Sequence, residues 1–466
     1  MDYQSFIDGD KTLLIAPAGY GKTHTIAECL KYTAGRQLIL THTHAGVASI
    51  KEKIKKHSII SNRYNVETIS SFAQKYVNAF YLGTDMPDQE NAREYHPFII
   101  DKAAIIFKSN PIKDVIKATY AGLFVDEYQD CTKPQHEMIL ALSESLKTHI
   151  LGDPLQGIFN FNGDLVNFDT DLLDFERVPD LSTPYRWHQC DRVSLGDALK
   201  DIRGKLDNQQ PIDLNNYSQH IEIIHINERD KYTPRTPYNQ RLQKLRNETN
   251  ILVIHPISSN KAPRTSFIKT FKGFYLVESI DDPDFYNISK QLDLANTDIS
   301  EKNIRDIAYK LFGQAGLGEW FNSNGLKNKR SEEDKARIAN IQKLIVNYNS
   351  YYNLKIILLA VKNLPNVKCY QSELFNSLIK AISISVIDGT SVYEAMKSHR
   401  NVIRRSGRKI IGKCIGTTLL TKGLEFDTVV ILDAHKFDCP KHLYVALTRC
   451  CKKLVIFSSQ STLSPY

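Results

Sequence analysis

The sequence has no uninterrupted apolar run of the roughly 18 residues that a membrane-spanning helix needs. Its first residues, Met1 to Ser5, lack the basic and apolar segments of a secretory signal, so we expect no leader. Eight cysteines are present without a Cys-x-x-Cys pair, which argues against a zinc site, an iron–sulfur centre or a disulfide framework. Internal repeats and low-complexity tracts are also absent. These absences predict a cytoplasmic protein with reduced thiols and no membrane contact.

The composition is that of a globular protein, with 42% hydrophobic and 24% charged residues. A chain of 466 residues is long enough for about three domains. The net charge is +8 and the isoelectric point is near 8.8. This excess is spread thinly, so it is compatible with a polyanionic partner without establishing one.

One stretch near the N-terminus has the pattern of a phosphate-binding loop. An apolar run ending at Ile15 reads as a buried strand, and Gly-Lys-Thr at 21–23 opens a helix. Backbone N–H groups of such a loop surround phosphates, Lys22 reaches the β and γ phosphates, and the Thr23 hydroxyl ligates Mg²⁺. A chance turn before an amphipathic helix is the alternative. The candidate nucleotide-binding residues here are Ala16, which replaces the usual first glycine, Ala18, Gly19, Gly21, Lys22 and Thr23.

Short β-prone runs at 12–15, 37–40, 122–125 and 149–151 each end beside polar residues. Because ligands bind outside the carboxyl ends of parallel strands, we expect Lys22, Thr41, Asp126 and Asp153 to meet at one sheet edge. The third run leads directly into Asp126 and Glu127. The aspartate suits Mg²⁺, and the neighbouring glutamate suits polarisation of an attacking water.

Several motifs occur together and in a fixed order. They are Asp-Glu-Tyr-Gln-Asp at 126–130, Gly-Asp-Pro-Leu-Gln-Gly-Ile-Phe at 152–159, Pro-Tyr-Arg at 184–186, Thr-Lys-Gly-Leu-Glu-Phe-Asp at 421–427 and Tyr-Val-Ala-Leu-Thr-Arg at 444–449. With the phosphate loop, this series resembles the superfamily 1 helicases of the UvrD/Rep type. The motifs cover both ends of the chain, whereas residues 190–405 carry none that we can place.

The resemblance implies ATP and Mg²⁺ as cofactors and gives roles to further residues. Gln4 would read adenine, although an exposed terminal glutamine is the alternative, and Tyr185 would stack on the base. Gln156 would sense the γ-phosphate. The remaining implied contacts are Arg186 and Arg449 as cations on the γ-phosphate, with surface ion pairs as the alternative, and Gly423 and Glu425 as nucleotide contacts from the second lobe.

The nucleic-acid contacts that the resemblance implies depart further from the family pattern. The segment 40–46 has His42, His44 and Ala45 where the family carries an aromatic residue, an asparagine and a lysine. His42 could still stack on a base, or it could be a structural histidine. Asn162 and Leu419 also replace family residues. The candidate DNA-binding residues are Thr41, His42, Ser70, Phe72, Phe159 and Phe161, of which the last two could instead be core phenylalanines.

The family fold implies an α/β protein of two RecA-like P-loop lobes with parallel sheets, each carrying a helical insertion. The first lobe would comprise residues 1–72 and 116–187, with a short helical insertion at 73–115. The second would comprise residues 188–284 and 406–466, with a reduced helical insertion at 285–405. Helices are expected at 303–312, 332–352, 371–382 and 392–400, and a loop at 313–329.

These features predict an ATP-dependent 3′–5′ translocase or helicase acting on single-stranded DNA, or on DNA with a single-stranded tail. One alternative is a DNA-gated ATPase switch without productive unwinding, and another is a P-loop kinase for a small molecule. The short insertions also resemble the helicase-like subunit of Gabija-type antiviral defence systems, in which a nuclease is the partner. A free-standing accessory helicase is an alternative of nearly equal weight.

Overall fold

The fold is taken from a computed structural model of the chain. The described residues are 2–87, 91–159, 163–231, 233, 235–256, 260–271, 273–277, 283–295, 299–406, 410 and 412–466. Within them, no helix combines the length and the apolar character needed to cross a bilayer.

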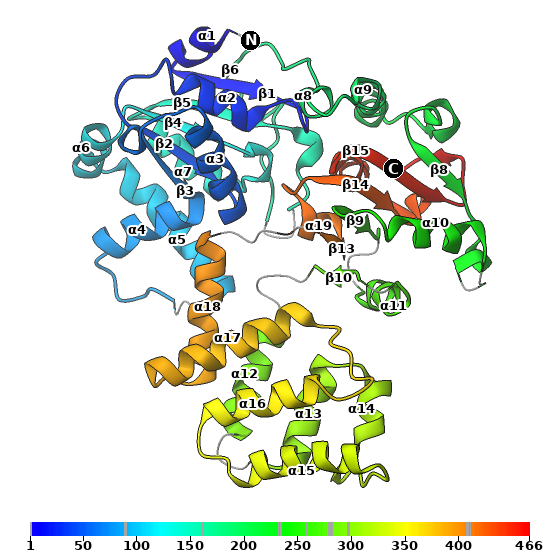
Figure 1. The fold of residues 1–466 in the computed structure, drawn as a ribbon. Helices are drawn as coiled ribbons and strands as arrows, with labels where there is room; N and C mark the ends of the chain where they lie inside the picture. Colours follow the sequence, from blue (N-terminus) through cyan, green and yellow to red (C-terminus); the bar gives the residue numbers. More distant parts are fainter. Residues whose placement is uncertain are drawn as a thin grey trace. The chain divides into compact units, whose positions relative to one another are not determined.

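The first lobe is built on a six-stranded parallel sheet in the order β3-β2-β4-β5-β1-β6 (Figure 1). Four of its strands confirm the apolar runs of the sequence, and β3 and β6 were not predicted. The strands are β1 (Lys11–Ile15), β2 (Gln37–Thr41), β3 (Tyr64–Thr68), β4 (Gly122–Val125), β5 (Lys147–Gly152) and β6 (Glu176–Arg177).

Helices cover this sheet, and those of the predicted insertion share its hydrophobic core. Phe72 and Tyr76 of α4 and Phe107 of α5 pack in one buried cluster with Leu38 and Leu123 of the strands. The described helices within 73–115 thus share the core of the lobe, and the bounds of the insertion stay a prediction. The helices are α1 (Tyr3–Asp8), α2 (Lys22–Cys29), α3 (His44–Lys56), α4 (Ile69–Phe80), α5 (Ala92–Lys108), α6 (Asn110–Thr119) and α7 (Lys133–Ser143).

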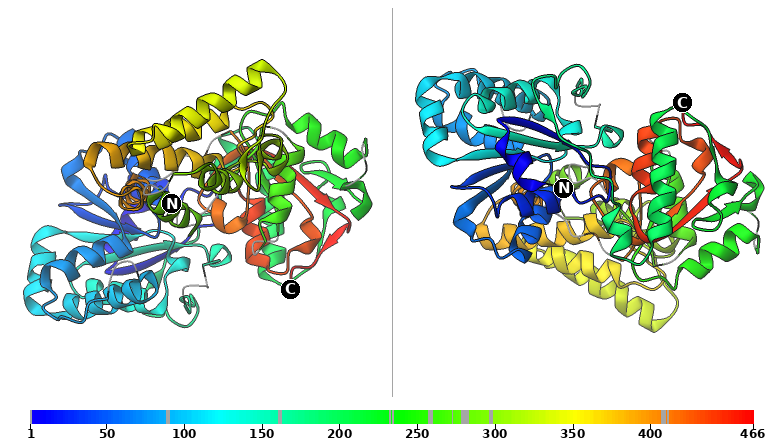
Figure 2. Two further views of the ribbon diagram at one scale, coloured as in Figure 1. Left: turned by 90° about the horizontal axis from the view of Figure 1, so that it is seen from below. Right: turned by 90° about the horizontal axis from the view of Figure 1, so that it is seen from above.

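The second lobe has another six-stranded sheet, in the order β10-β13-β9-β14-β15-β8. The sequence predicts strands here at 221–226, 251–255, 274–278, 414–418, 429–433 and 454–458. Each of these runs overlaps a strand, although β14 begins at Phe426, three residues earlier than predicted. Strand β15 (red in Figure 2) pairs with β8 (green), which is far from it in sequence. The strands are β8 (Glu222–His225), β9 (Ile251–Ile254), β10 (Tyr275–Leu276), β13 (Lys413–Gly416), β14 (Phe426–Ile431) and β15 (Cys450–Ser458).

Two parallel sheets flanked by helices confirm the predicted α/β class of two P-loop lobes. Short strands β7 (Ile212–Asp213) and β16 (Thr462–Leu463) pair antiparallel in this part of the chain. The helices here are α8 (Tyr185–His188), α9 (Val193–Asp207), α10 (Pro237–Leu245), α19 (Thr418–Thr421) and α20 (Pro440–Leu447).

Two compact units can be separated: residues 1–258, 406–412 and 417–466 in one, and residues 259–405 with 413–416 in the other. The second unit has its own core around Trp320, Phe375 and Leu358. Besides β10 and β13, its elements are α11 (Ala262–Thr270), α12 (Pro283–Ala295), α13 (Glu301–Leu311), α14 (Gln314–Trp320), β11 (Phe321–Asn322), β12 (Gly325–Leu326), α15 (Glu332–Val346), α16 (Tyr351–Lys362), α17 (Ser372–Asp388) and α18 (Val392–Ser406).

The sequence prediction was wrong for residues 313–329, which form α14 and a two-stranded hairpin rather than a loop. The glycines suggested a loop, but Gly316 has a packing role, because a Cβ there would lie 2.2 Å from the Asn366 carbonyl oxygen. Leu317 and Trp320 are buried one turn apart and hold the helix in the core. The single helix predicted at 332–352 is instead two helices that break between Val346 and Tyr351.

Candidate nucleotide-binding and hydrolysis site

The phosphate-binding loop joins β1 to α2 with the backbone that the motif requires. Gly19 and Gly21 have φ of +79° and +97°, which is the left-handed region that favours glycine. A Cβ on Gly19 would also lie 2.7 Å from the ring of Trp187. Lys22 is buried, and its ammonium donates to the Ala16 carbonyl oxygen at 2.9 Å. The Lys22 ammonium is thus held against the phosphate-binding loop, where it could contact a bound phosphate.

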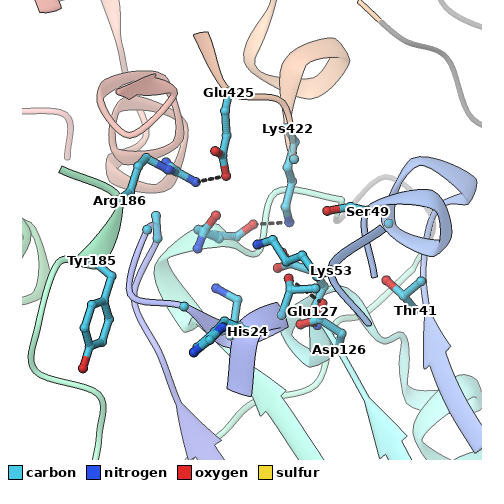
Figure 3. Close-up of a pocket in the computed structure, with 18 of the residues that line it drawn as sticks. His24, Thr41, Ser49, Lys53, Asp126, Glu127, Tyr185, Arg186, Lys422 and Glu425 are labelled. Carbon is cyan, nitrogen blue, oxygen red and sulfur yellow. Dashed lines mark hydrogen bonds and ion pairs between the residues drawn. The ribbon is translucent and has the colours of Figure 1, made fainter. Parts of the chain in front are cut away.

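A cavity of about 560 Å³ lies against this loop. Figure 3 shows that its wall combines residues of the first lobe with Lys422 and Glu425 from the segment that leads into β14. Of the residues predicted for the nucleotide and hydrolysis site, the following line it: Ala18, Gly19, Gly21, Lys22, Thr23, Asp126, Glu127, Gln156, Tyr185, Arg186, Gly423, Glu425 and Arg449.

Two oxygen ligands suited to Mg²⁺ meet at the base of the cavity. The Thr23 hydroxyl donates to Asp126 Oδ2 at 3.5 Å, and the Asp126 carboxylate also accepts from the Glu127 backbone N–H at 3.0 Å. Mg²⁺ takes one or two such ligands and completes its shell with phosphates and water. The donor set therefore fits the ion that the motif implies.

Glu127 is oriented by an unusual backbone conformation, with φ of +57° directly after β4. Its carboxylate accepts a hydrogen bond from the Gln129 amide. Burial opposes ionisation, but Lys22 and Lys422 outweigh it and hold the pKa of Glu127 below its ordinary value. Burial and the neighbouring Glu127 raise the pKa of Asp126. The pair thus places one ionised carboxylate, that of Glu127, where it can accept a proton from water.

Asp153 is completely buried and connects the phosphate-binding loop to Gln156 through hydrogen bonds. Its carboxylate accepts from the Ala18 backbone N–H at 3.1 Å, from Gln156 Nε2 at 2.8 Å and from Arg203 Nη1 at 2.7 Å. The sequence placed Asp153 at this sheet edge, but Arg203 was missed because α9 carries no motif. The hydrogen bonds of Asp153 therefore fix the side chain of Gln156 relative to the phosphate-binding loop.

Two arginines enter the cavity from different parts of the chain. Arg449 is buried, donates to Gln156 Oε1 at 3.2 Å and is also held by the Val445 carbonyl oxygen at 2.9 Å. Burial and the nearby Arg186 lower the pKa of Arg449 to about 10, so it stays charged at neutral pH. Arg186 pairs with Glu425 Oε1 at 2.7 Å. Both cations are therefore near the predicted γ-phosphate position.

Lys422 was not predicted as a site residue, yet it bridges the two lobes. Its ammonium donates to Asp130 Oδ1 at 2.5 Å and to the Gln156 carbonyl oxygen, and it lies 4.7 Å from the ring centroid of Phe159. Burial raises the pKa of Asp130 to about 7, and the ammonium is the contact that favours the ionised carboxylate. Lys422 thus connects the two motifs that contain Asp130 and Gln156.

Two residues were predicted to contact adenine, and the structure places Tyr185 at the cavity but not Gln4. Tyr185 is half exposed and lies against Gly21, as a base-stacking ring would. Gln4 is exposed, donates to Asp8 Oδ1 at 2.8 Å and is not among the cavity residues, whereas its neighbour Tyr3 is. An adenine contact by Gln4 stays a prediction that would need this side chain to turn.

Two of the six candidate DNA-binding residues, Thr41 and Phe72, are buried in the structure. Phe72 is completely buried against Tyr76 and Phe107, so the prediction that its ring contacts DNA is corrected to a core role. Thr41 is also buried, at the end of β2, where it lines the nucleotide cavity rather than an open surface.

The other four candidates remain predictions. Burial, followed by Lys422, lowers the pKa of His42 to about 3, and its Nε2 lies 3.4 Å from Cys131 Sγ. Ser70 is half buried in the first turn of α4. Phe159 lines the cavity beneath Lys422, and Phe161 lies outside the described residues.

Comparisons with known proteins agree with these motifs. Residues 4–162 match the AAA domain family. The chain is 33% identical to the exonuclease/helicase protein RexA of Lactococcus lactis subsp. cremoris (strain MG1363), over 24% of this chain and 9% of that protein. It is 27% identical to the Gabija protein GajB of Bacillus cereus (strain VD045), over 35% of this chain and 42% of that protein. The chain spans less than half the length of these relatives.

Among solved structures, the chain is similar to Arterivirus nonstructural protein 10, a helicase, in complex with DNA. The identity is 10%, the coverage is 97% of this chain and 63% of that chain, and the TM-score is 0.37, which is too low to establish a shared fold. The AAA domain match and the curated relatives, taken with the ordered motifs, confirm that this chain resembles the superfamily 1 helicases of the UvrD/Rep type.

Proposed function

We propose that this protein is an ATP-dependent motor that moves along single-stranded DNA. The observation that carries the proposal is the position of Gln156. Its side chain is held by Asp153 on the phosphate-loop side and by Arg449 on the other, while Lys422 holds its backbone. A residue fixed in this way can report the state of the γ-phosphate to both lobes.

The proposed hydrolysis uses the residues of the cavity in distinct roles. Lys22 and the two arginines offset the charge that develops on the γ-phosphate, and Glu127 accepts the proton of the attacking water. Thr23 and Asp126 would hold Mg²⁺, which would supply further positive charge to offset that of the phosphates. Because Arg449 and Glu425 belong to the second lobe, hydrolysis depends on the lobes being together.

Single-stranded DNA, or DNA with a single-stranded tail, is the proposed substrate, and 3′–5′ polarity is what the resemblance to UvrD/Rep helicases implies. The net charge of +8 is compatible with a nucleic-acid partner, and the ring of Phe159, which lines the cavity, is a candidate for stacking on a base. Ser70, His42, Phe159 and Phe161 remain the candidate contacts.

The test is the ATPase rate with and without single-stranded DNA, followed by strand displacement on duplexes with a 3′ or a 5′ tail. DNA should raise the rate, higher salt should weaken the effect, and only the 3′-tailed duplex should be unwound. The Lys22→Ala variant should be inactive throughout. An ATPase that ignores every nucleic acid would refute the motor and favour the kinase alternative.

A DNA-gated switch without unwinding is the second candidate. The substituted segment around His42 and the buried positions of Thr41 and Phe72 favour it, because they leave fewer described side chains for gripping a strand. Stimulation of the ATPase by DNA without displacement of either tailed strand would support this candidate over the motor.

A nuclease partner and a role in antiviral defence are also part of the proposal. They are supported by the similarity to the Gabija protein GajB and to the exonuclease/helicase protein RexA. The eight cysteines, all in the described part of the chain, form no disulfide, which suits a cytoplasmic location. Co-purification from the native host with a nuclease, and loss of phage resistance on gene deletion, are expected. Elution alone together with unchanged phage sensitivity would refute the defence role and leave the ATPase.

A further inference from the structure

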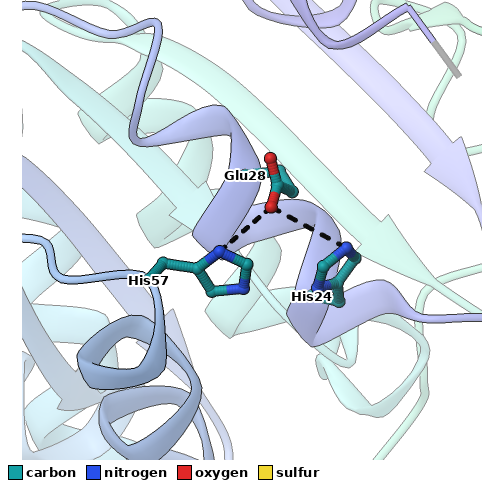
Figure 4. Close-up of side chains that lie close together, drawn as sticks. All are labelled: His24, Glu28 and His57. Atoms are coloured by element: carbon teal, nitrogen blue, oxygen red, sulfur yellow. Dashed lines mark ion pairs between the residues drawn. The ribbon is translucent and has the colours of Figure 1, made fainter.

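Three side chains that can ligate a metal ion lie together beside the nucleotide cavity (Figure 4). His24 and Glu28 are four residues apart on α2, so they project from the same face of the helix. His57 caps the C-terminal end of α3, which packs against α2. Glu28 Oε1 lies 3.0 Å from His57 Nδ1 and 3.9 Å from His24 Nε2.

The cluster is open to the cavity rather than sealed in the core. The side chain of His24 is 50% exposed, and both histidines line the cavity. Their ring centroids are 5.1 Å apart, and the three ligand atoms lie within 4.8 Å of one another. An ion in the cavity can therefore reach His24 and His57, and Glu28 Oε1 lies beside both rings.

The ligand set differs in kind from that of the Mg²⁺ site. Thr23 and Asp126 offer only oxygen, which suits Mg²⁺. Two imidazole nitrogens and one carboxylate suit Zn²⁺ with a free coordination position. We propose that His24, Glu28 and His57 bind a Zn²⁺ ion at the wall of the cavity, and that this ion changes the affinity for nucleotide. Only the second half of this proposal rests on the proposed function.

Lys31 would compete with a metal ion for the Glu28 carboxylate. Its ammonium lies 2.8 and 2.9 Å from the two oxygens of Glu28. Zinc bonds of about 2.0–2.2 Å require His24 and Glu28 to come closer than 3.9 Å, which a rotation of the half-exposed His24 allows. Glu28 must also turn one oxygen from Lys31 to the ion. Removing the lysine charge should therefore tighten zinc binding.

The experiment is a Zn²⁺ titration of the purified full-length chain against a chromophoric chelator. We expect one ion per chain, and a loss of affinity of at least about tenfold in His24→Gln and in His57→Gln. Lys31→Met should bind zinc more tightly than the natural chain. The control is His220→Gln, which removes an exposed histidine elsewhere and should change nothing. Thermal melting of each variant checks that it is folded.

A second arm measures the affinity for fluorescent ADP without Mg²⁺, with and without zinc. Zinc should shift this affinity in the natural chain and not in His57→Gln. Equal zinc affinity in all four variants, or no binding, would overturn the site itself. Zinc binding as expected without a shift in ADP affinity would overturn only its effect on the cavity. A chain that binds zinc but never ADP would refute the proposed function and leave the metal site.

Discussion

At the scale of single residues, the site depends on a few side chains whose orientation is set by backbone geometry. Glu127 takes a left-handed conformation directly after β4, which turns its carboxylate toward Lys22 and Lys422. The two cations keep that carboxylate ionised in a buried position. A neutral side chain of the same shape would keep the packing and lose the proton acceptor.

We therefore expect Glu127→Gln to bind ATP normally and to hydrolyse it about 10²- to 10⁴-fold more slowly, as is typical for loss of a general base. Single-turnover hydrolysis and equilibrium binding of ATP measure the two effects separately. Glu137→Gln, at an exposed position on α7, is the matched control. A Glu127→Gln rate within a few-fold of the natural rate would assign the base to another residue.

At the scale of elements, α4 and α5 belong to the core of the first lobe. Phe72 contacts Tyr76, Phe107 and Tyr120 and has no exposed surface. Phe72→Ala should reduce the free energy of unfolding by about 3–5 kcal/mol, because it leaves a cavity among large rings. Urea denaturation measures the change. Phe80→Ala, on the same helix at a half-exposed position, should cost far less. Equal effects of the two changes would contradict the core assignment.

A second prediction at this scale concerns β5, where His149 is buried against Phe6 and Phe124. Burial lowers its pKa to about 4 from an ordinary value near 6.5. Between these values the unfolded chain binds the proton and the folded chain does not. The contribution of this neutral histidine is therefore present above pH 6.5 and is lost as pH falls toward 4.

The loss on going from pH 7.5 to 4.5 should be about 2–3 kcal/mol for this group. His149→Gln should be less stable throughout, because it loses ring contacts, and should show a shallower fall in stability with acid. His220→Gln is the exposed control. Urea denaturation at several pH values gives the slopes, and parallel curves for the natural chain and His149→Gln would exclude this histidine as a cause.

At the scale of the whole molecule, Lys422 of the second lobe contacts the first lobe. Its ammonium contacts Asp130 and Gln156 of the first lobe, and both members of the ion pair are buried. Removing one partner of a buried pair typically costs about 3–5 kcal/mol, because the remaining charge is left uncompensated. Lys422→Met should therefore weaken the contact between the lobes.

We expect Lys422→Met to lower the melting temperature and to reduce the stimulation of the ATPase by DNA. The double variant Lys422→Met, Asp130→Asn removes both charges, so it should recover much of the stability without recovering the stimulation. Calorimetry and ATPase assays on the same samples separate these effects. Full stimulation by DNA in the double variant would show that the pair has only a structural role.

Local patterns in the sequence predicted the phosphate loop and four strands of the first sheet, and the resemblance to UvrD/Rep helicases predicted the α/β class of two lobes. A strand followed by a glycine-rich turn specifies the loop at Lys22, and strands leading into Asp126 and Asp153 place these residues at one edge of the parallel sheet. Short apolar runs likewise located the six strands of the second sheet. These signals lie within a few residues of one another, so no knowledge of distant contacts was needed.

Which side chains face the cavity and which are buried follows from packing and could not be predicted locally. Phe72 and Thr41 have the residue types of DNA contacts, but packing against α5 and the end of β2 buries them. Lys422 meets Asp130, Arg203 meets Asp153, and His57 meets His24 across long separations in sequence. Such contacts depend on how helices and strands pack together, which a local sequence pattern does not reveal. Adjacent residues therefore determine the chemistry of the phosphate loop, whereas the tertiary fold determines which distant side chains contact it.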